Sequence, residues 1–245
     1  MKSRLFNLAV LLSLVVLNPC WAQVALDATA EGEVDPSTSL TIPLTVSGAN
    51  RALYAPCVHS PGGDDVTALT ATFNGVPMTP IITDTTTHSN RHVVVFRLIA
   101  PATGTNNAVF DWGGTNRSFA CALASFTGVN QTTPEDAYVL TDGGGGVSSI
   151  SRSVASATGD MIMDVVVLPN GILNLVVNNG NTQLQQRSGG AGGLNSMGTS
   201  YEAGAATETL GWTWDTATVA AVQWAWNINA ASAGTPELTT RRRGQ

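Results

Sequence analysis

Hydrophobic and polar residues alternate with a period of two along much of the chain. Leu40, Ile42, Leu44 and Val46 share one face of an extended segment, and Pro43 lies between them on the other face. Such alternation is typical of a β-strand with one buried face. Proline cannot donate a hydrogen bond to a neighbouring strand, so Pro43 predicts that this strand lies at a sheet edge.

Further segments show the same pattern or a fully apolar one. They are 210–214, 222–228, the run HVVVFRLI at 92–99 and the run MIMDVVVL at 161–168. The two runs are too short for stable helices and rich in β-branched residues, so they also predict strands. Asn74-Gly75 lies between two extended segments and predicts a tight β-hairpin. Beyond residue 22, no segment combines a helical period with capping residues.

These patterns predict an all-β fold, because roughly ten to thirteen short strands joined by Gly, Asn, Thr and Pro turns are typical of a sandwich or barrel. We predict a single antiparallel β-sandwich over residues 38–230, jelly-roll-like and of the concanavalin or lectin class. Residues 23–37 are predicted to be an N-terminal extension, and 231–245 a flexible tail with a basic end. The glycine-rich stretches 141–149 and 188–198 are predicted loops.

The first 22 residues have the features of a secretory signal peptide. Lys2 and Arg4 precede an apolar run at 5–17, and small residues occupy the positions before a cleavage point after Ala22. The run is too short to span a bilayer, so we expect no stable membrane insertion. Acylation of Cys20 is the alternative, which the proline before it disfavours. We therefore predict a secreted protein, extracellular, periplasmic or on the cell surface.

The net charge of the chain disfavours one class of partner, nucleic acid. Removal of Lys2 and Arg4 leaves 9 basic and 17 acidic side chains, a formal net charge of −8, and no lysine. Basic side chains are what hold phosphate groups, so we expect no nucleic-acid partner.

Two cysteines, Cys57 and Cys121, follow the predicted cleavage point. Disulfides persist in oxidising compartments, so export favours a bridge between them. Such a bridge would close a loop of some 60 residues and stabilise the fold by about 4 kcal/mol in the chain-entropy model. The alternative is two buried thiols on different strands.

Three stretches together resemble a known module. They are RALYAPCVHSPGGDDVTALTATFNGVPMTPI, RHVVVFRLIAPATGTNNAVFDW and ACALASFTGVNQTTP. The chain resembles a β-sandwich module of secreted bacterial proteins and phage particle proteins, whose strand runs into Ser-Phe-Thr-Gly-Val, a polar spacer and Thr-Pro. Here these positions are Ser125–Val129 and Thr133-Pro134. The resemblance covers residues 38–230 and implies a jelly-roll-like or lectin-like sandwich, but it supplies no catalytic or binding residue.

The polar spacer is the first candidate binding feature. Asn130, Gln131, Thr132 and Thr133 form an uncharged loop after a predicted strand. Loops at one end of a sandwich commonly carry function, so these residues are candidates for the rim of a ligand site. The alternative is a turn whose side chains bond only their own backbone.

A calcium site is the second candidate. Asp64 and Asp65 follow a Pro-Gly-Gly turn, and Asp111 or Asp84 would have to arrive from another loop to complete the oxygen ligands. A solvated acidic turn is the alternative.

The histidines do not predict a zinc site. The chain has three, His59, His88 and His92. The last two are four residues apart, about 13 Å along a strand, which is too far for one metal ion.

Four tryptophans, Trp212, Trp214, Trp224 and Trp226, alternate in two predicted strands. Exposed rings would stack on sugars, but their apolar neighbours on the same faces favour a place in the core.

Signatures of catalysis are missing from the sequence, which has no Gly-x-Ser-x-Gly, no His-Glu-x-x-His and no phosphate-binding loop. A glycan hydrolase would need acids such as Asp164, Glu202 and Glu208 to converge in the fold. Asp164 lies inside an apolar run, where a charge needs a partner, and Arg97 or Arg152 is the candidate.

The sequence therefore favours a secreted, non-catalytic module that attaches to a surface, a glycan or an assembly. The candidate partner is a glycan or cell-surface polymer. A phage or particle structural module and a glycan hydrolase are the alternatives, and export favours the first interpretation over the phage module. The arginines at 241–243 either hold an acidic surface or form a frayed end. The oligomeric state is not fixed by these patterns.

Overall fold

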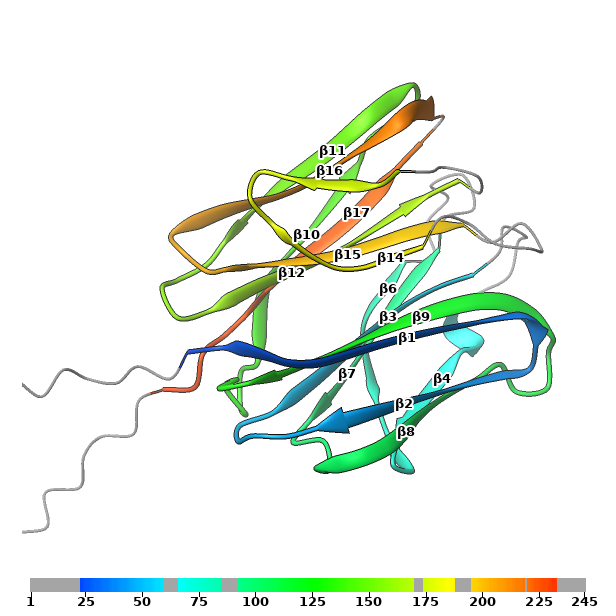
Figure 1. Cartoon of the computed structure of the whole chain (residues 1–245), viewed down its shortest axis with the longest axis vertical. Coiled ribbons are helices and arrows are strands. Elements are labelled where there is room, and N and C mark those ends of the chain that lie inside the picture. The colour runs from blue at the N-terminus through cyan, green and yellow to red at the C-terminus, as the bar shows by residue number, and fades with distance from the viewer. Residues whose placement is uncertain are drawn as a thin grey trace, which may run out of the picture.

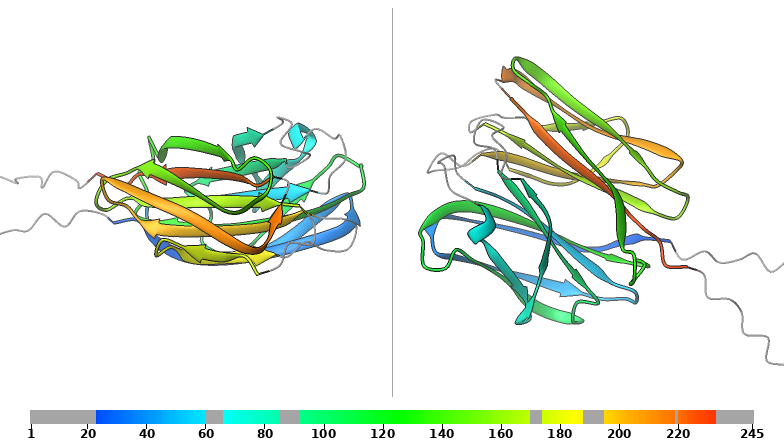
Figure 2. Two further views of the ribbon diagram at one scale, coloured as in Figure 1. Left: turned by 90° about the horizontal axis from the view of Figure 1, so that it is seen from above. Right: turned by 180° about the vertical axis from the view of Figure 1, so that it is seen from behind.

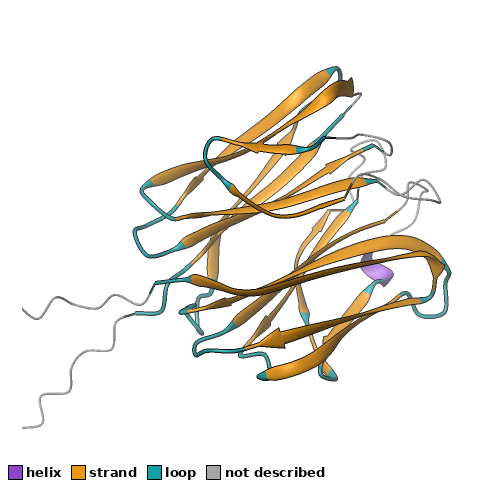
Figure 3. Cartoon of the chain, in the orientation of Figure 1, coloured by secondary structure: helices purple, strands orange, loops and turns teal. Residues whose placement is uncertain are grey.

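The computed structural model describes residues 23–59, 66–84, 92–169, 174–187, 195–218 and 220–232. Within these ranges the chain forms antiparallel strands and one three-residue 3-10 helix, Val66–Ala68 (Figure 3). No helix of the described part is long and apolar enough to cross a membrane. The all-β, jelly-roll-like class predicted from the two-residue period is confirmed.

The first half of the chain builds two sheets. The outer sheet of the first sandwich has the strand order β2-β8-β4-β5, and its inner sheet has the order β1-β9-β3-β7-β6. The bounds are β1 Ala25–Ser37, β2 Ser39–Val46, β3 Ala52–His59, β4 Thr70–Phe73, β5 Val76–Pro77, β6 Thr79–Asp84, β7 Val93–Ile99, β8 Gly104–Asp111 and β9 Arg117–Thr127.

The second half builds two more sheets. The inner sheet of the second sandwich has the order β10-β17-β12-β15-β14, and its outer sheet has the order β11-β16-β13. The bounds are β10 Glu135–Asp142, β11 Val147–Ala155, β12 Met161–Leu168, β13 Val176–Asn178, β14 Thr182–Arg187, β15 Ser196–Ala203, β16 Thr207–Thr218 and β17 Val222–Ile228. The four sheets stack as layers, with the two inner sheets face to face (Figures 1 and 2).

The two halves repeat one topology. If β1, β2, β3 and β4 are matched to β10, β11, β12 and β13, and β6–β9 to β14–β17, both inner sheets have the same order, and so do both outer sheets apart from β5. The register agrees as well. Ala52 of β3 lies opposite Phe126 of β9, as Met161 of β12 lies opposite Ile228 of β17. The described chain therefore contains the same jelly-roll-like sandwich twice.

The central strands β3 and β12 of the inner sheets are buried on both faces. In β3, Tyr54 and Val58 face the second sandwich, whereas Leu53 and Cys57 face the outer sheet of their own sandwich. A strand covered on both faces needs apolar side chains at successive positions, which accounts for the continuous run MIMDVVVL of β12.

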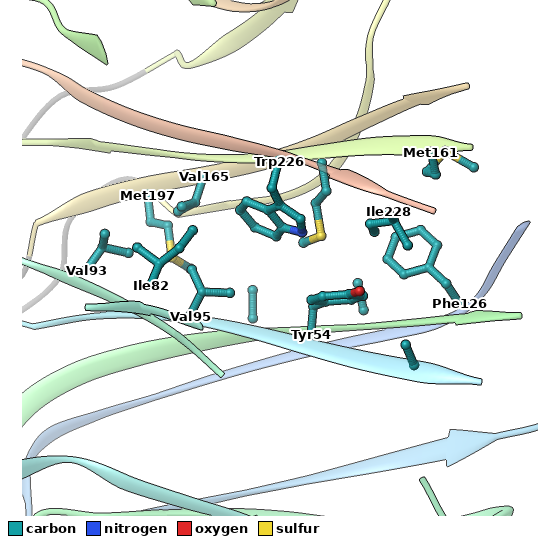
Figure 4. Packing of buried hydrophobic residues seen from close by; sticks show 14 of the residues in the cluster. Tyr54, Ile82, Val93, Val95, Phe126, Met161, Val165, Met197, Trp226 and Ile228 are labelled. Carbon is teal, nitrogen blue, oxygen red and sulfur yellow. The ribbon is translucent and has the colours of Figure 1, made fainter. Parts of the chain in front are cut away.

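One hydrophobic core joins the two sandwiches (Figure 4). Tyr54 and Phe126 of the first sandwich pack against each other at a ring-centroid distance of 6.1 Å, and Tyr54 lies 6.0 Å from Trp226 of the second. Valine and methionine side chains of β7, β12 and β15 continue this core. Burial of one such side chain stabilises a fold by roughly 1.5–3 kcal/mol. We therefore expect the sandwiches to unfold together, and a single folding unit over 38–230 stays a prediction.

Polar contacts also cross between the sandwiches. Arg97 Nη1 on β7 donates to both carboxylate oxygens of Glu135 on β10, at 2.7 Å each. Burial raises the pKa of Glu135, and the Arg97 guanidinium opposes that rise. Trp224 Nε1 of β17 donates to Asp84 Oδ2 at the end of β6, at 2.9 Å. These bonds add polar contacts to the hydrophobic junction between the two inner sheets.

Several local predictions are confirmed. The strand with Pro43 is β2, at the edge of its sheet. Asn74 and Gly75, with φ of 50° and 75°, form the turn between β4 and β5. Cys57 and Cys121 face each other across β3 and β9 and form a disulfide, with 4.1 Å between their Cα atoms.

The segment expected to be an N-terminal extension is instead part of a sheet. Residues 25–37 form β1, which pairs with β9 along its length. Most of its side chains are half-buried or exposed, because β1 lies at the sheet edge and beside β2. Its sequence therefore lacks the clean alternation that marks the other strands.

Candidate functional site

A cavity of about 330 Å³ opens at one end of the second sandwich, and we call it the end cavity. Its lining residues come from the start of β10, from the β11–β12 turn and from the end of β17. They are Asp136, Ala137, Ala155, Ser156, Ala157, Asp160, Asn227 and Asn229. This volume is at the small end of the range for ligand pockets, roughly 300–1,000 Å³.

The first and last described residues lie near the β11–β12 turn (Figure 1), which forms one wall of the end cavity. Val24 N donates to Gly159 O at 2.9 Å, and Ala230 N donates to Asp160 Oδ1 at 2.8 Å. The backbone at Val24 and at Ala230 therefore supports the β11–β12 turn that carries Asp160.

Local backbone features shape two walls of the cavity. The register of β10 on β17 shifts between Asp136 and Val139, and Ala137 there has a positive φ of 49°. A bulge of this kind bends an edge strand and redirects its side chains, and a positive φ is uncommon for alanine. In the β11–β12 turn, Ala157 N donates to Asp160 Oδ2 at 3.1 Å, which closes the turn.

The buried amide of Asn227, 2% exposed, joins the walls. Its Nδ2 lies 3.0 Å from Asp136 Oδ1, 3.0 Å from Asp160 Oδ2 and 2.7 Å from Asn229 Oδ1. Its Oδ1 accepts from Ser156 Oγ at 2.7 Å. An amide nitrogen has only two hydrogens, so three acceptor oxygens compete for two donors.

The first sandwich has a matching cluster at the corresponding place. Asp27 lies at a bulge in β1, Ser47 lies in the β2–β3 turn, and Ser125 occupies the position in β9 that Asn227 occupies in β17. Asp27 accepts from Ser47 N at 2.8 Å, from Ser47 Oγ at 2.5 Å and from Ser125 Oγ at 3.1 Å. Burial raises the pKa of Asp27, but these bonds outweigh burial and lower the pKa below its ordinary value. This cluster supplies its carboxylate with donors from the protein.

The predicted ligand rim forms a self-bonded turn. Asn130 Oδ1 accepts from the backbone N–H groups of Thr132 and Thr133, at 2.9 and 3.1 Å. Gln131 Nε2 donates to Val129 O at 2.9 Å. The side chains of Asn130 and Gln131 therefore stabilise their own loop.

This loop also bonds Asn229, one of the residues that line the end cavity. Asn130 N donates to Asn229 O at 2.8 Å, and Asn229 Nδ2 donates to Thr133 O at 2.9 Å. None of the four rim residues lines the end cavity itself. Direct ligand contact by Asn130, Gln131, Thr132 and Thr133 stays a prediction.

The predicted calcium site also stays a prediction. Asp64 and Asp65 lie outside the described residues. Asp111 is exposed and accepts from Gly113 N at 2.8 Å, and Asp84 is buried against Trp224. Among the described residues, no three His, Cys, Asp or Glu side chains are grouped to hold a metal ion.

Two histidines lie together in a way that the sequence did not indicate. His59 ends β3 and His92 precedes β7, and their rings stack with centroids 5.5 Å apart. His92 Nδ1 lies 3.2 Å from Asp84 O, and Trp112 packs edge-on against His59. His88 lies outside the described residues.

The tryptophans belong to the core, as predicted. Trp212 and Trp226 are fully buried and Trp214 is 5% exposed. Trp224 is half-buried at the junction of the two sandwiches, where its ring nitrogen bonds Asp84.

The predicted ion pair of Asp164 with Arg97 or Arg152 is wrong. Asp164 is fully buried in the second sandwich, and Arg97 pairs with Glu135. Neutral groups bond Asp164 instead: the N–H and hydroxyl of Ser200 at 2.9 and 2.7 Å, Trp212 Nε1 at 2.8 Å and Gln223 Nε2 at 2.7 Å. Four donors satisfy a buried carboxylate without a cation, so the apolar run of β12 tolerates the charge.

The three acids considered for hydrolysis do not share a cleft. Asp164 is enclosed in the core, and none of the three lines the end cavity. Burial and the nearby Glu208 both raise the pKa of Glu202. In the end cavity, the fold brings Asp136 and Asp160 together.

The outer sheets present hydroxyl groups to solvent. Thr45 and Thr105 bond each other across β2 and β8 at 2.8 Å, and Ser153 and Thr209 do so across β11 and β16 at 2.8 Å. These faces are polar and uncharged at the paired positions.

Comparison with known proteins identifies no family. No protein-family description and no curated protein matches the chain. Two crystal structures of the glycoside hydrolase BuGH86 in complex with neoagarooctaose, the wild type and a variant, show a weak structural likeness. Each has 11% sequence identity and a TM-score of 0.24, with 86% of this chain and 35% of that chain covered. The chain thus spans about a third of their length, and at these values neither structure carries an argument about its function.

Proposed function

We propose that the protein is an exported, non-catalytic β-sandwich module that attaches to a glycan through the end cavity. The disulfide Cys57–Cys121 supports export, because such bridges persist in oxidising compartments. The first 22 residues, with their signal-peptide pattern, support the same conclusion.

The observation that carries the proposal is the lining of the end cavity. Two carboxylates, two amides and one hydroxyl surround a space of about 330 Å³, on strand ends held by the sandwich. Sugar hydroxyls are recognised by hydrogen bonds from such groups, and a rigid frame lowers the entropic cost of binding.

A binding role fits this cavity better than hydrolysis. A glycosidase needs two carboxyl groups on opposite sides of the scissile bond, one of them free to give a proton. Asp160 is held by Ala157 N, Ala230 N and Asn227 Nδ2, and Asp136 bonds the same Asn227 amide. Both acids therefore reach the same buried group from adjoining walls, and Asp160 has its oxygens occupied.

Binding to a panel of soluble polysaccharides and immobilised glycans tests the proposal, first in EDTA and then with calcium. The wild type is expected to bind at least one glycan without releasing reducing ends. Asp136→Asn is expected to weaken that binding, and Asp27→Asn, at the matching place in the first sandwich, is expected to keep it. Thermal unfolding of both variants controls for folding. Failure to bind any glycan, or equal binding by Asp136→Asn, would refute the site.

A further inference from the structure

We infer that the end cavity selects a sugar unit that carries a primary ammonium group, so that its ligand is a glycan with free amino sugars. The inference rests on the proposed function and names the ligand class of the same cavity.

The side chains that line the end cavity have few hydrogen-bond donors left for a ligand. The Ser156 hydroxyl donates to Asn227, and both hydrogens of Asn227 Nδ2 are taken by the surrounding oxygens. Asn229 Nδ2 already donates to Thr133 O, which leaves at most one side-chain N–H for a ligand. The acceptors, in contrast, outnumber the donors that reach them, and no hydrogen bond from the described residues reaches Asp136 Oδ2. A ligand of this cavity must therefore mainly donate.

The matching cluster in the first sandwich shows which donors are missing. There, Ser47 gives both its N–H and its hydroxyl to Asp27. In the second sandwich the Ser156 hydroxyl turns to Asn227, and Ser156 N points at Ala206 O, 3.5 Å away. Asp136 thus has the position of Asp27 without its two serine donors, and its exposed side chain lines the end cavity.

Charge then selects among donating ligands. The lining contains two aspartates and no basic side chain. An anionic sugar is repelled, and a neutral hydroxyl offers one hydrogen. An ammonium group offers three hydrogens and a positive charge, and charge-assisted bonds to carboxylates are roughly twice as strong as neutral ones. The cavity therefore favours the amino sugar over the acetylated or neutral sugar.

Isothermal titration calorimetry in EDTA, at a pH where the sugar amine is protonated, tests the inference. The probes are the hexamers of glucosamine, N-acetylglucosamine and glucose. The glucosamine hexamer is expected to bind wild-type protein at least about tenfold more tightly than either of the others. Asp136→Asn is expected to remove most of that preference, and Asp27→Asn is expected to retain it.

Each contrary result has a distinct meaning. Equal or tighter binding of the acetylated or neutral hexamer would overturn the inference and leave glycan attachment standing. Displacement of the hexamer by 1,5-diaminopentane at equal concentration would overturn it too, because an ammonium without a sugar would then suffice. A requirement for calcium would place a metal ion in the cavity instead of the amine. No binding of any glycan, here or in the wider panel, would remove the proposed function as well.

Discussion

Removal of the buried carboxylate of Asp164 should remove a specific pH dependence from the stability of the protein. Burial raises the pKa of this group from its ordinary value of 3.8 to about 6, although four hydrogen bonds to the carboxylate oppose the rise. A group whose pKa is higher in the folded state is stabilised there by its proton. Its contribution to stability is therefore complete below pH 3.8 and is lost as the pH rises through about 6.

The magnitude follows from the size of the shift. A difference of about two pKa units corresponds to about 3 kcal/mol, at about 1.4 kcal/mol per unit. We predict that the free energy of unfolding of the wild type, relative to that of Asp164→Asn, falls by about 3 kcal/mol between about pH 4 and pH 7. The carboxamide would also face the donors of Trp212 and Gln223, but this cost is independent of pH and drops out of the comparison.

Urea denaturation followed by tryptophan fluorescence measures this difference, since four tryptophans of the described chain are buried. Asp215→Asn, at an exposed carboxylate, controls for the loss of one surface charge. A difference between wild type and Asp164→Asn that stays constant with pH, or grows as the pH rises, would refute the reasoning.

Two further predictions concern the junction and a turn. Arg97→Met should destabilise the protein by about 3–5 kcal/mol in urea denaturation, because it leaves the 2%-exposed side chain of Glu135 without its cation. Arg97→Met combined with Glu135→Leu should recover most of the loss, and a single variant as stable as the wild type would contradict the role of the pair. Gly128→Ala should lower the melting temperature far more than Gly75→Ala. Both glycines have a positive φ, 71° and 75°, so the backbone strain of an alanine is similar at the two positions. At Gly128 an added Cβ would also meet the backbone oxygen of Gln23 at 2.2 Å, whereas at Gly75 it would meet no atom within 4 Å. An equal drop in melting temperature for the two variants would show that the backbone of Gln23 does not lie against Gly128.

The individual strands could be predicted because each signal is local. Alternation in β2, the Asn74-Gly75 turn and the apolar run of β12 each depend on a few neighbouring residues. The disulfide could be proposed from the number of cysteines and the export signal alone.

The stacking of two sandwiches could not be predicted in the same way. The run of β12 indicates a strand covered on both faces, but it does not say which sheets cover it. In β3, Leu53 and Cys57 lie on one face and Tyr54 and Val58 on the other. The sequence does not show which sheet covers each face, because that depends on long-range pairing. The repeat itself lies in strand order and register, with little trace in residue identity.

The end cavity escaped prediction because its residues are distant in sequence. Asp136, Asp160 and Asn227 lie on three separate strands or turns, and no local sequence pattern links them. A usable signal was Asn227, a polar residue between the buried Trp226 and Ile228 that faces the interior of the second sandwich. The partner of Asp164 was mispredicted for a related reason, since the neutral donors that bond it come from β15, β16 and β17.

A crystal structure of the protein with the glucosamine hexamer tests the central claim most directly. The account predicts a sugar ring in the end cavity, with its amine within hydrogen-bond distance of Asp136 and of the Asn229 side-chain oxygen. An oligosaccharide bound instead on the hydroxyl-covered outer face of β2 and β8, with the end cavity filled only by water, would contradict it.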